Sequence, residues 1–209
     1  MTFKYVKIVN GPFVENCYLL YDSASMDGIL IDPGDEPGKI LGVADKNRVN
    51  VKAVYNTHGH IDHAGAADEI CKKLKIPFAL HKGDEKLVGS LSEQANMFGF
   101  TTSLKSPEIS IFLEDNQIFK VGDQDVKVIH TPGHTKGGVC FLAGNFIFAG
   151  DTLFAGSIGR SDLPGGDGRE LIQSIKKRLM VLDDNIKVFS GHGPETTIGR
   201  EKMYNPYLG

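Results

Sequence analysis

The sequence is poor in cysteine and has no long apolar run, and both shortages exclude classes of protein. Its three cysteines, Cys17, Cys71 and Cys140, are odd in number, lie far apart and form no C-x-x-C pair. A disulfide framework is therefore not expected, whereas buried, reduced thiols in a cytoplasmic protein are. Residues 1–22 alternate apolar and polar side chains, so neither a signal peptide nor a membrane span is predicted.

An excess of charge of one sign is also lacking. The formal net charge is −3, from 23 Lys and Arg against 26 Asp and Glu, and both signs are spread along the chain. The sequence contains no basic stripe of the kind that attracts nucleic acid. This pattern argues against a nuclease or an RNA-processing role, and it leaves a small molecule as the expected partner.

The chain does have enough apolar residues for a substantial core, 41% of 209. Short β-prone runs separated by turn residues predict strands at 3–9, 17–22, 28–34, 51–56, 77–81, 117–121, 125–134, 137–144, 145–151 and 186–193. Apolar spacing predicts helices at 37–47, 62–75, 168–182 and 197–204, and a helix followed by a loop across 84–105. No long polar linker divides the chain, so we predict a single α/β domain over 1–209 with two similar halves, about 1–105 and 106–209.

One segment, "NTHGHIDHAG", stands out because it holds three of the seven histidines of the chain. His58, His60, Asp62 and His63 fall within six consecutive positions. Neutral imidazoles and carboxylates are ligands of zinc and related divalent ions. Four such side chains would crowd one tetrahedral shell, so the spacing favours two adjacent ions. Solvated loop histidines are the alternative for a shorter "THGH" alone.

Three downstream turns offer further ligands, because each follows a predicted strand. "TPGHT" contributes His134, "FAGDT" contributes Asp151, and "SGHGP" contributes His192. Loops at one end of a sheet converge on one cleft. We therefore predict a metal site of five histidines and two aspartates in which Asp151 bridges the ions and water completes the coordination, as a hydrolytic site requires.

Three other polar residues have different interpretations. His81, at a strand end, is expected at the surface or behind the ligands, and His130 is expected to orient the turn that carries His134. Arg160 has two equal interpretations, as an anchor for an anionic group of the substrate or as the structural partner of Asp162 or Asp167.

Four motifs together, "THGHIDHAGA", "HTPGHTKGG", "GDTLFAGSIGR" and "SGHGPETTIGREKMYNPYL", resemble the metallo-β-lactamase superfamily. The sequence is most similar to its glyoxalase II-like branch, the hydroxyacylglutathione hydrolases, and to the short, single-domain bacterial members. The resemblance implies a four-layer αββα sandwich with the metal site at one edge. It also implies one ion on His58, His60 and His134, a second ion on Asp62, His63 and His192, and Asp151 between them.

The chain departs from full-length glyoxalase II enzymes in two places. It ends soon after the last motif, so no C-terminal helical glutathione-binding domain is expected. In "GRSDLPGG", Arg160 supplies the basic residue of the glutathione-contacting stretch, but Asp162 stands where an aromatic residue is usual. The departures concern the substrate and leave the predicted metal ligands unchanged.

The expected reaction is therefore hydrolysis of a thioester such as S-lactoylglutathione, by attack of a metal-bridging hydroxide that Asp62 helps to orient. Zinc is the favoured metal, although iron and manganese accept the same ligands. The alternatives are a mononuclear iron persulfide dioxygenase, which "GRSD" also resembles, and a hydrolase of another ester or a lactone. Antibiotic hydrolysis is not expected, and a non-enzymatic metal-binding module would predict saturated coordination.

Overall fold

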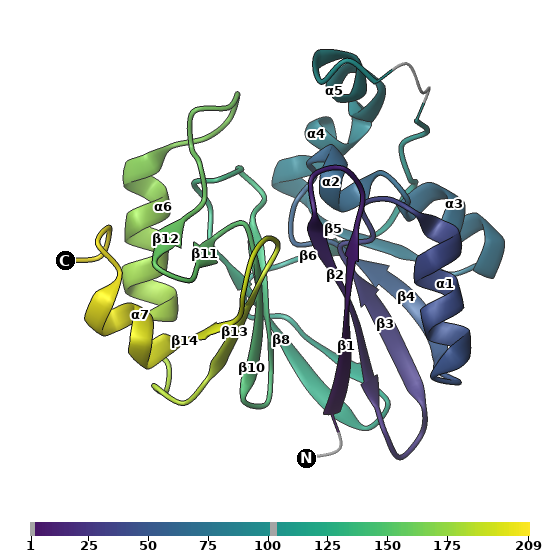
Figure 1. Cartoon of the computed structure of the whole chain (residues 1–209), viewed down its shortest axis with the longest axis horizontal. Helices are drawn as coiled ribbons and strands as arrows, with labels where there is room; N and C mark the ends of the chain where they lie inside the picture. Colours follow the sequence, from purple (N-terminus) through teal and green to yellow (C-terminus); the bar gives the residue numbers. More distant parts are fainter. Residues whose placement is uncertain (1–2, 101–103) are drawn as a thin grey trace.

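Two six-stranded sheets face each other in the computed structural model, which describes residues 3–100 and 104–209 (Figure 1). The first sheet has the order β1-β2-β3-β4-β5-β6 and the second has the order β14-β13-β10-β9-β8-β7. The strands of the first sheet are β1 (Phe3–Asn10), β2 (Glu15–Asp22), β3 (Asp27–Ile31), β4 (Asn50–Tyr55), β5 (Phe78–His81) and β6 (Ile109–Leu113). Those of the second are β7 (Ile118–Val121), β8 (Gln124–His130), β9 (Val139–Ala143), β10 (Phe146–Gly150), β13 (Lys187–Ser190) and β14 (Thr196–Thr197). A small hairpin, β11 (Leu153–Phe154) and β12 (Ser157–Ile158), stands apart from both.

Helices cover the outer face of each sheet, so the predicted four-layer αββα sandwich is confirmed (Figure 1). The helical segments on the first sheet are α1 (Pro37–Lys46), α2 (Ile61–Ala64), α3 (Ala67–Leu74), the short turn η1 (Lys82–Asp84), α4 (Glu85–Gly89) and α5 (Leu91–Met97). Those on the second are α6 (Gly168–Ser174), a π-helical turn η2 (Ile175–Leu179) and α7 (Ile198–Tyr204). No helix among the described residues is long and apolar enough to cross a membrane.

Three separate apolar cores hold the four layers together, and β2 shows how the sequence builds two of them. All eight residues of β2 are buried. Because side chains alternate along a strand, Cys17 and Leu19 pack toward the helices of the first layer, while Tyr18 and Leu20 pack between the sheets. The third core lies between the second sheet and α6, η2 and α7.

The strand ends place the polar motifs at one edge of the sandwich. β4 ends at Tyr55 just before the histidine cluster, and β8, β10 and β13 end just before the turns that carry His134, Asp151 and His192. β10 and β13 run parallel, as do β3, β4, β5 and β6, so their carboxyl ends share an edge within each sheet.

Several elements differ from the prediction, among them the two-residue strands β11, β12 and β14, which were not predicted. Strand β6 was missed because it is a short edge strand after a loop, and it pairs with β5 in the first sheet. The helix predicted at 62–75 is broken into α2 and α3, because the Ala66 amide donates to the carbonyl of Pro33 instead of continuing the helix. The helix predicted at 168–182 ends at Leu179, and its second part is the π-helical turn η2. Residues 101–103 of the predicted helix-and-loop segment lie outside the described residues.

The core between the sheets can be tested at Phe189, whose ring is buried. Its centroid lies 5.7 Å from that of Tyr18 and 5.3 Å from that of Phe148. Phe189→Ala is expected to lower the free energy of unfolding by about 3–5 kcal/mol in urea denaturation. The control is Ile118→Ala, at a side chain that is 60% exposed, and its effect should stay within about 0.5 kcal/mol. Equal effects of the two changes would contradict this account of the core.

Candidate metal centre

The histidine cluster lies on the loop between β4 and α2, and buried polar groups fix the shape of this loop. The Asn56 side-chain amide donates to the carbonyls of His58 and His63, at 3.3 and 2.8 Å, and so ties the two ends of the cluster together. The Ile61 amide, at the start of α2, donates to Gln94 Oε1 from α5 at 2.9 Å. The loop is therefore held from both sides before any ion binds.

The structure brings His58, His60 and His134 together into a first triad. His134 Nε2 lies 3.3 Å from His58 Nε2 and 3.0 Å from His60 Nδ1. The ligand atoms of all three lie within 4.8 Å of one another. Such close convergence of three imidazole nitrogens is the geometry of a site for a cation.

Hydrogen bonds on the far side of two of these rings leave their inner nitrogens without a proton. His134 Nδ1 lies 2.7 Å from the carbonyl of Arg160, which can only accept, so Nδ1 carries the proton and Nε2 is free. Thr57 Oγ1 donates to Asp32 at 2.6 Å and therefore accepts from His58 Nδ1 at 3.0 Å. Both inner nitrogens are thus lone-pair donors for a metal.

A second triad consists of Asp62, His63 and His192, whose ligand atoms also lie within 4.8 Å of one another. His192 Nε2 is 3.2 Å from Asp62 Oδ2, and His63 Nε2 is 3.8 Å from the same oxygen. The outer nitrogen of His63, Nδ1, lies 3.1 Å from Asp32 Oδ2, so Nε2 faces the triad. Asp32 therefore orients one histidine of each triad, His63 directly and His58 through Thr57.

Asp151 lies between the two triads. Its Oδ1 is 3.4 Å from His63 Nε2, and its Oδ2 is 3.7 Å from His134 Nε2 and 3.8 Å from His192 Nε2. One carboxylate thus faces ligands of both groups, as a bridge between two ions requires. The seven residues predicted from sequence converge at this edge.

Two buried atoms at the centre have no hydrogen-bond partner in the described chain. They are His63 Nε2 and Asp151 Oδ1. Leaving a buried polar group unpaired costs free energy, so both atoms call for an electron-pair acceptor between them. A divalent cation meets that need, and the donor set of imidazoles and carboxylates fits it.

The electrostatics of the two triads differ. Burial and the neighbouring imidazoles hold the pKa of His58 well below its usual value, and burial together with His134 lowers the pKa of His60 to about 4. Burial would also lower the pKa of His63, but the Asp151 and Asp62 carboxylates outweigh it and raise that pKa. His58 and His60 are therefore neutral at pH 7, whereas the second triad lies in a negative field that attracts a cation.

Asp84 braces the loops of the first triad from behind. Its buried carboxylate accepts hydrogen bonds from the Gly59 amide at 3.0 Å, from Thr135 Oγ1 at 2.7 Å and from the Gly137 amide at 2.7 Å. The segment of His58 and His60 is thereby joined to the turn of His134. Burial raises the pKa of Asp84, and this effect outweighs the hydrogen bonds, which lower it.

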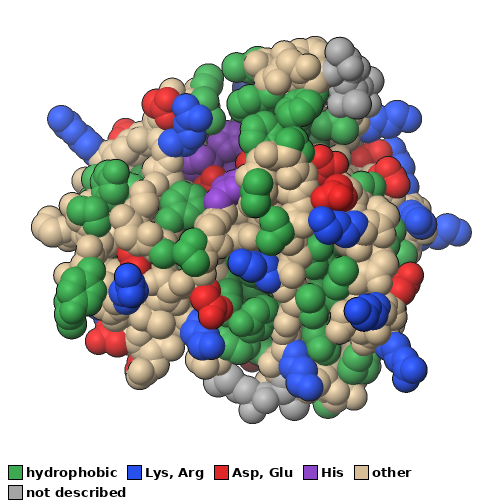
Figure 2. Space-filling model, viewed as in Figure 1, with side chains coloured by type: hydrophobic (Ala, Val, Ile, Leu, Met, Phe, Trp, Pro, Cys, Tyr) green, Lys and Arg blue, Asp and Glu red, His purple; other side chains and the backbone are tan. Residues whose placement is uncertain are grey.

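The triads open into a cleft beside α4 and α5, and Figure 2 shows histidine side chains at the bottom of a hollow. This cavity, of about 270 Å³, is lined by His60, Asp62, His134 and Asp151 on one side. Its other walls are mostly apolar and include Phe13, Leu87, Met97, Phe98 and Leu163. The site can therefore admit a ligand with an apolar part.

Arg160 also lines this cleft, but its exposed guanidinium forms an ion pair with Asp162. Nε and Nη2 of Arg160 donate to the two oxygens of Asp162 at 2.8 and 2.7 Å. Asp167, the other partner considered from sequence, instead caps the N-terminus of α6. The structural ion pair between Arg160 and Asp162 is therefore present. Because Arg160 also lines the cleft, its side chain can reach a ligand that binds there.

The two remaining histidines lie outside the triads. The rings of His81 and His130 stack with centroids 4.2 Å apart. His130 Nε2 lies 3.0 Å from the carbonyl of Lys136, which belongs to the same turn as His134. Neither residue is in a group of converging ligand atoms among the described residues.

Sequence reasoning missed the residues that hold the ligands in place, above all Asp32, Thr57 and Asp84. Asp32 follows β3 just as the predicted ligands follow their strands, so its position was a usable signal. Asp84 carried no such signal, because it ends a short helical turn, η1, far from any motif.

Comparison with known proteins places the chain among metal-dependent relatives. The model of the metallo-beta-lactamase superfamily matches residues 10–192. The hydroxyacylglutathione hydrolase GloC of Haemophilus influenzae is 38% identical over 205 residues, covering 94% of this chain and 93% of that protein. The B3 metallo-β-lactamase BLEG-1 superposes with a TM-score of 0.90 at 32% identity, covering 98% and 99% of the two chains. The protein TTHA1623, solved in a di-iron-bound form, gives a TM-score of 0.88 at 37% identity, covering 97% and 100%.

Gly191 tests how tightly the centre is packed. A Cβ on Gly191 would collide with Asp151 Oδ1 and with Cε1 of His63. Gly191→Ala is therefore expected to displace these side chains, to lower bound metal by about one ion per chain in elemental analysis, and to destabilise the protein by about 1–3 kcal/mol.

The matched control is Gly42→Ala, in the middle of α1, where an added Cβ meets nothing within 4 Å. That change should leave the metal content intact and stabilise the helix by about 0.5–1 kcal/mol. Unchanged metal content in Gly191→Ala would show that the centre is looser than these contacts indicate.

Proposed function

Because the chain belongs to the metallo-β-lactamase superfamily, we propose that it is a cytoplasmic, binuclear metal-dependent hydrolase that cleaves a thioester such as S-lactoylglutathione. The observation that carries the proposal is the placement of Asp151 between two triads of ligand atoms. One triad would hold the first ion through His58, His60 and His134. The other triad would hold the second ion, and zinc is the metal we propose for both.

The metal ions would supply Lewis acidity and would lower the pKa of water to about 7. The chain itself orients the reaction. Asp62, whose side chain is 19% exposed, borders the cleft and can accept a hydrogen bond from the attacking water at its carboxylate. Its pKa is held low, because His63 and His192 outweigh the effect of burial, so the carboxylate is available as an acceptor at neutral pH.

The walls of the cleft favour a thioester over a strongly polar substrate. Phe13, Leu87, Met97 and Phe98 give an apolar surface on which an acyl or thiol chain can pack. A thiolate is a good leaving group, so the site needs no strong general acid for it. Arg160 at the rim would bind a carboxylate of the substrate, in exchange for its present partner Asp162.

The proposal is tested by elemental analysis of freshly purified protein together with turnover of a substrate panel. The panel contains S-lactoylglutathione, a lactone, a β-lactam and glutathione persulfide with oxygen uptake. About two ions per chain with thiol release would support the thioester hydrolase. One iron per chain with oxygen uptake and no thioester turnover would replace it by a persulfide dioxygenase, and preferred β-lactam turnover would assign the activity named for BLEG-1.

Asp151→Ala should remove two-metal occupancy and activity together, with turnover falling by about 10³-fold or more, because both triads lose the carboxylate between them. Metal content and kcat are measured on the same sample. Asp45→Ala, at an exposed aspartate of α1, is the control and should match the unmodified protein in both. Two ions retained in Asp151→Ala would overturn the bridging role.

Arg160→Ala should raise KM about tenfold for a thioester with a carboxylate on its thiol and should leave kcat nearly unchanged, because it removes a binding contact. Asp162→Ala frees the guanidinium from its ion pair and should lower KM for the same substrate. An uncharged thioester should respond to neither change. If neither variant changes KM, Arg160 does not bind the substrate and has only its structural ion pair with Asp162.

A further inference from the structure

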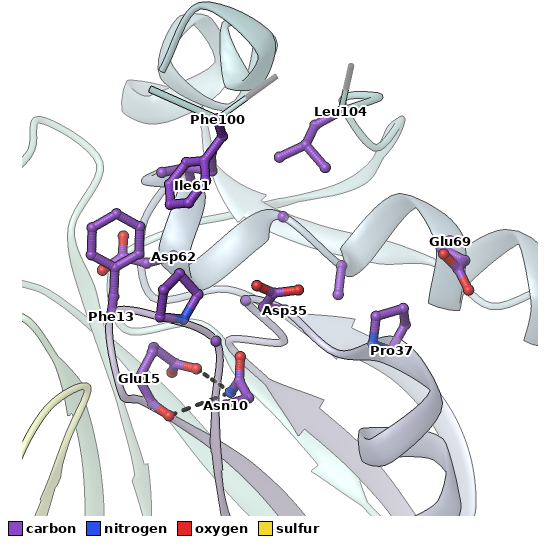
Figure 3. A pocket seen from close by; sticks show the side chains of 15 residues that line it. Asn10, Phe13, Glu15, Asp35, Pro37, Ile61, Asp62, Glu69, Phe100 and Leu104 are labelled. Atoms are coloured by element: carbon purple, nitrogen blue, oxygen red, sulfur yellow. Dashed lines mark hydrogen bonds between the residues drawn. The ribbon is translucent and has the colours of Figure 1, made fainter. Parts of the chain in front are cut away.

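A second cavity lies on the other side of Phe13 from the metal centre, between the β1–β2 turn and the helices α2 and α3 (Figure 3). Its volume is about 370 Å³, within the usual range for small-molecule sites, and Phe13, Ile61 and Asp62 line both cavities. None of its other lining residues belongs to the triads. The cavity is therefore adjacent to the cleft but separate from it.

The floor of this cavity holds a buried acceptor without a partner. Asn10 is 2% exposed, and its Nδ2 donates to Glu15 Oε2 at 2.6 Å and to the carbonyls of Ile8 and Glu15. These contacts fix the orientation of the amide, so Oδ1 must be the atom that faces away from Glu15. Oδ1 has no hydrogen-bond partner in the described chain, and it points toward the cavity in Figure 3. A donor group in the cavity would satisfy it.

The mouth of the cavity is acidic. The exposed carboxylates of Asp35 and Glu69 border it, and no Lys or Arg lines it. Neither carboxylate forms an ion pair within residues 3–100 and 104–209. The donor that satisfies Asn10 would therefore enter through a negative field, which favours a cation over a neutral group.

The spacing of the carboxylates argues against a bare metal ion. Groups of three ligand atoms within 4.8 Å occur in the described chain only around the metal centre, and none includes Asp35 or Glu69. Apolar side chains, among them Pro12, Phe13 and Ile61, form the remaining wall. We propose that this cavity is a binding site for an organic ammonium ion, with an N–H group on Asn10 Oδ1, its charge in the negative field of Asp35 and Glu69, and an apolar body against Phe13 and Ile61. This proposal does not depend on the hydrolysed substrate.

The test uses metal-loaded protein and two probes of similar shape, 2-phenylethylamine, which is a cation at pH 7, and 2-phenylethanol, which is neutral. Calorimetric titration should show the amine binding at least about tenfold more tightly, because a charged donor meets a buried acceptor and two carboxylates. Amide NMR shifts should gather around Gly11 and Gly34, both of which line the cavity. Equal affinities for the two probes, or shifts confined to the cleft, would overturn the proposal.

Variants at the mouth separate the site from the metal centre. Asp35→Asn combined with Glu69→Gln should weaken amine binding about tenfold and leave 2-phenylethanol unaffected, and metal content should not change. Glu85→Gln, at an exposed carboxylate that pairs with Lys82 outside the cavity, is the control. Amine binding that survives the double variant would contradict the ammonium site. Displacement of the amine by magnesium chloride at matched ionic strength would reassign the cavity to a metal ion.

Discussion

The buried carboxylate of Asp32 is the contact on which the geometry of the centre depends. It accepts from the Thr57 amide at 2.7 Å and from Thr57 Oγ1 at 2.6 Å, and it lies 3.1 Å from His63 Nδ1. Through Thr57 it sets the proton position of His58, and directly it sets that of His63. One side chain thus fixes the direction of a ring in each triad, and removing it would release both at once.

The centre can tolerate so many buried polar groups because they form a connected network. Asp84 and Asn56 hold backbone amides and carbonyls of the loops, and Tyr18 and Asn16 of β2 donate to the carbonyl of Ser190 at the end of β13. These last contacts join the two sheets beside the turn of His192. The carboxylates of Asp62 and Asp151 face His63 and the space between the triads. A cation bound there would offset the repulsion between the two carboxylates.

The sequence predicted those parts of the molecule that depend on local patterns. Most strands and helices followed from periodicity, whereas the four layers followed from the resemblance to the metallo-β-lactamase superfamily. The seven converging side chains followed from a dense cluster and three turns that each come after a strand. The parts that were missed depend on distant contacts. Strand β6 is recognisable only by its pairing with β5. The break after α2 depends on the hydrogen bond from the Ala66 amide to the Pro33 carbonyl. The role of Asp84 depends on the three groups that donate to its carboxylate in the folded chain.

The walls around the centre come from elements that carry none of the ligands, with the exception of α2. Phe13 belongs to the turn between β1 and β2, and Leu87 and Met97 belong to α4 and α5. Another wall residue, Gln94 of α5, accepts a hydrogen bond from the Ile61 amide and so helps to hold the ligand loop. Changes at the apolar side chains Phe13, Leu87 and Met97 can therefore alter the substrate while that hydrogen bond stays in place. Phe13 and Ile61 also separate the cleft from the acidic cavity. A ligand that moves either side chain would reshape the wall against which a substrate packs, so occupancy of one cavity would be coupled to affinity in the other.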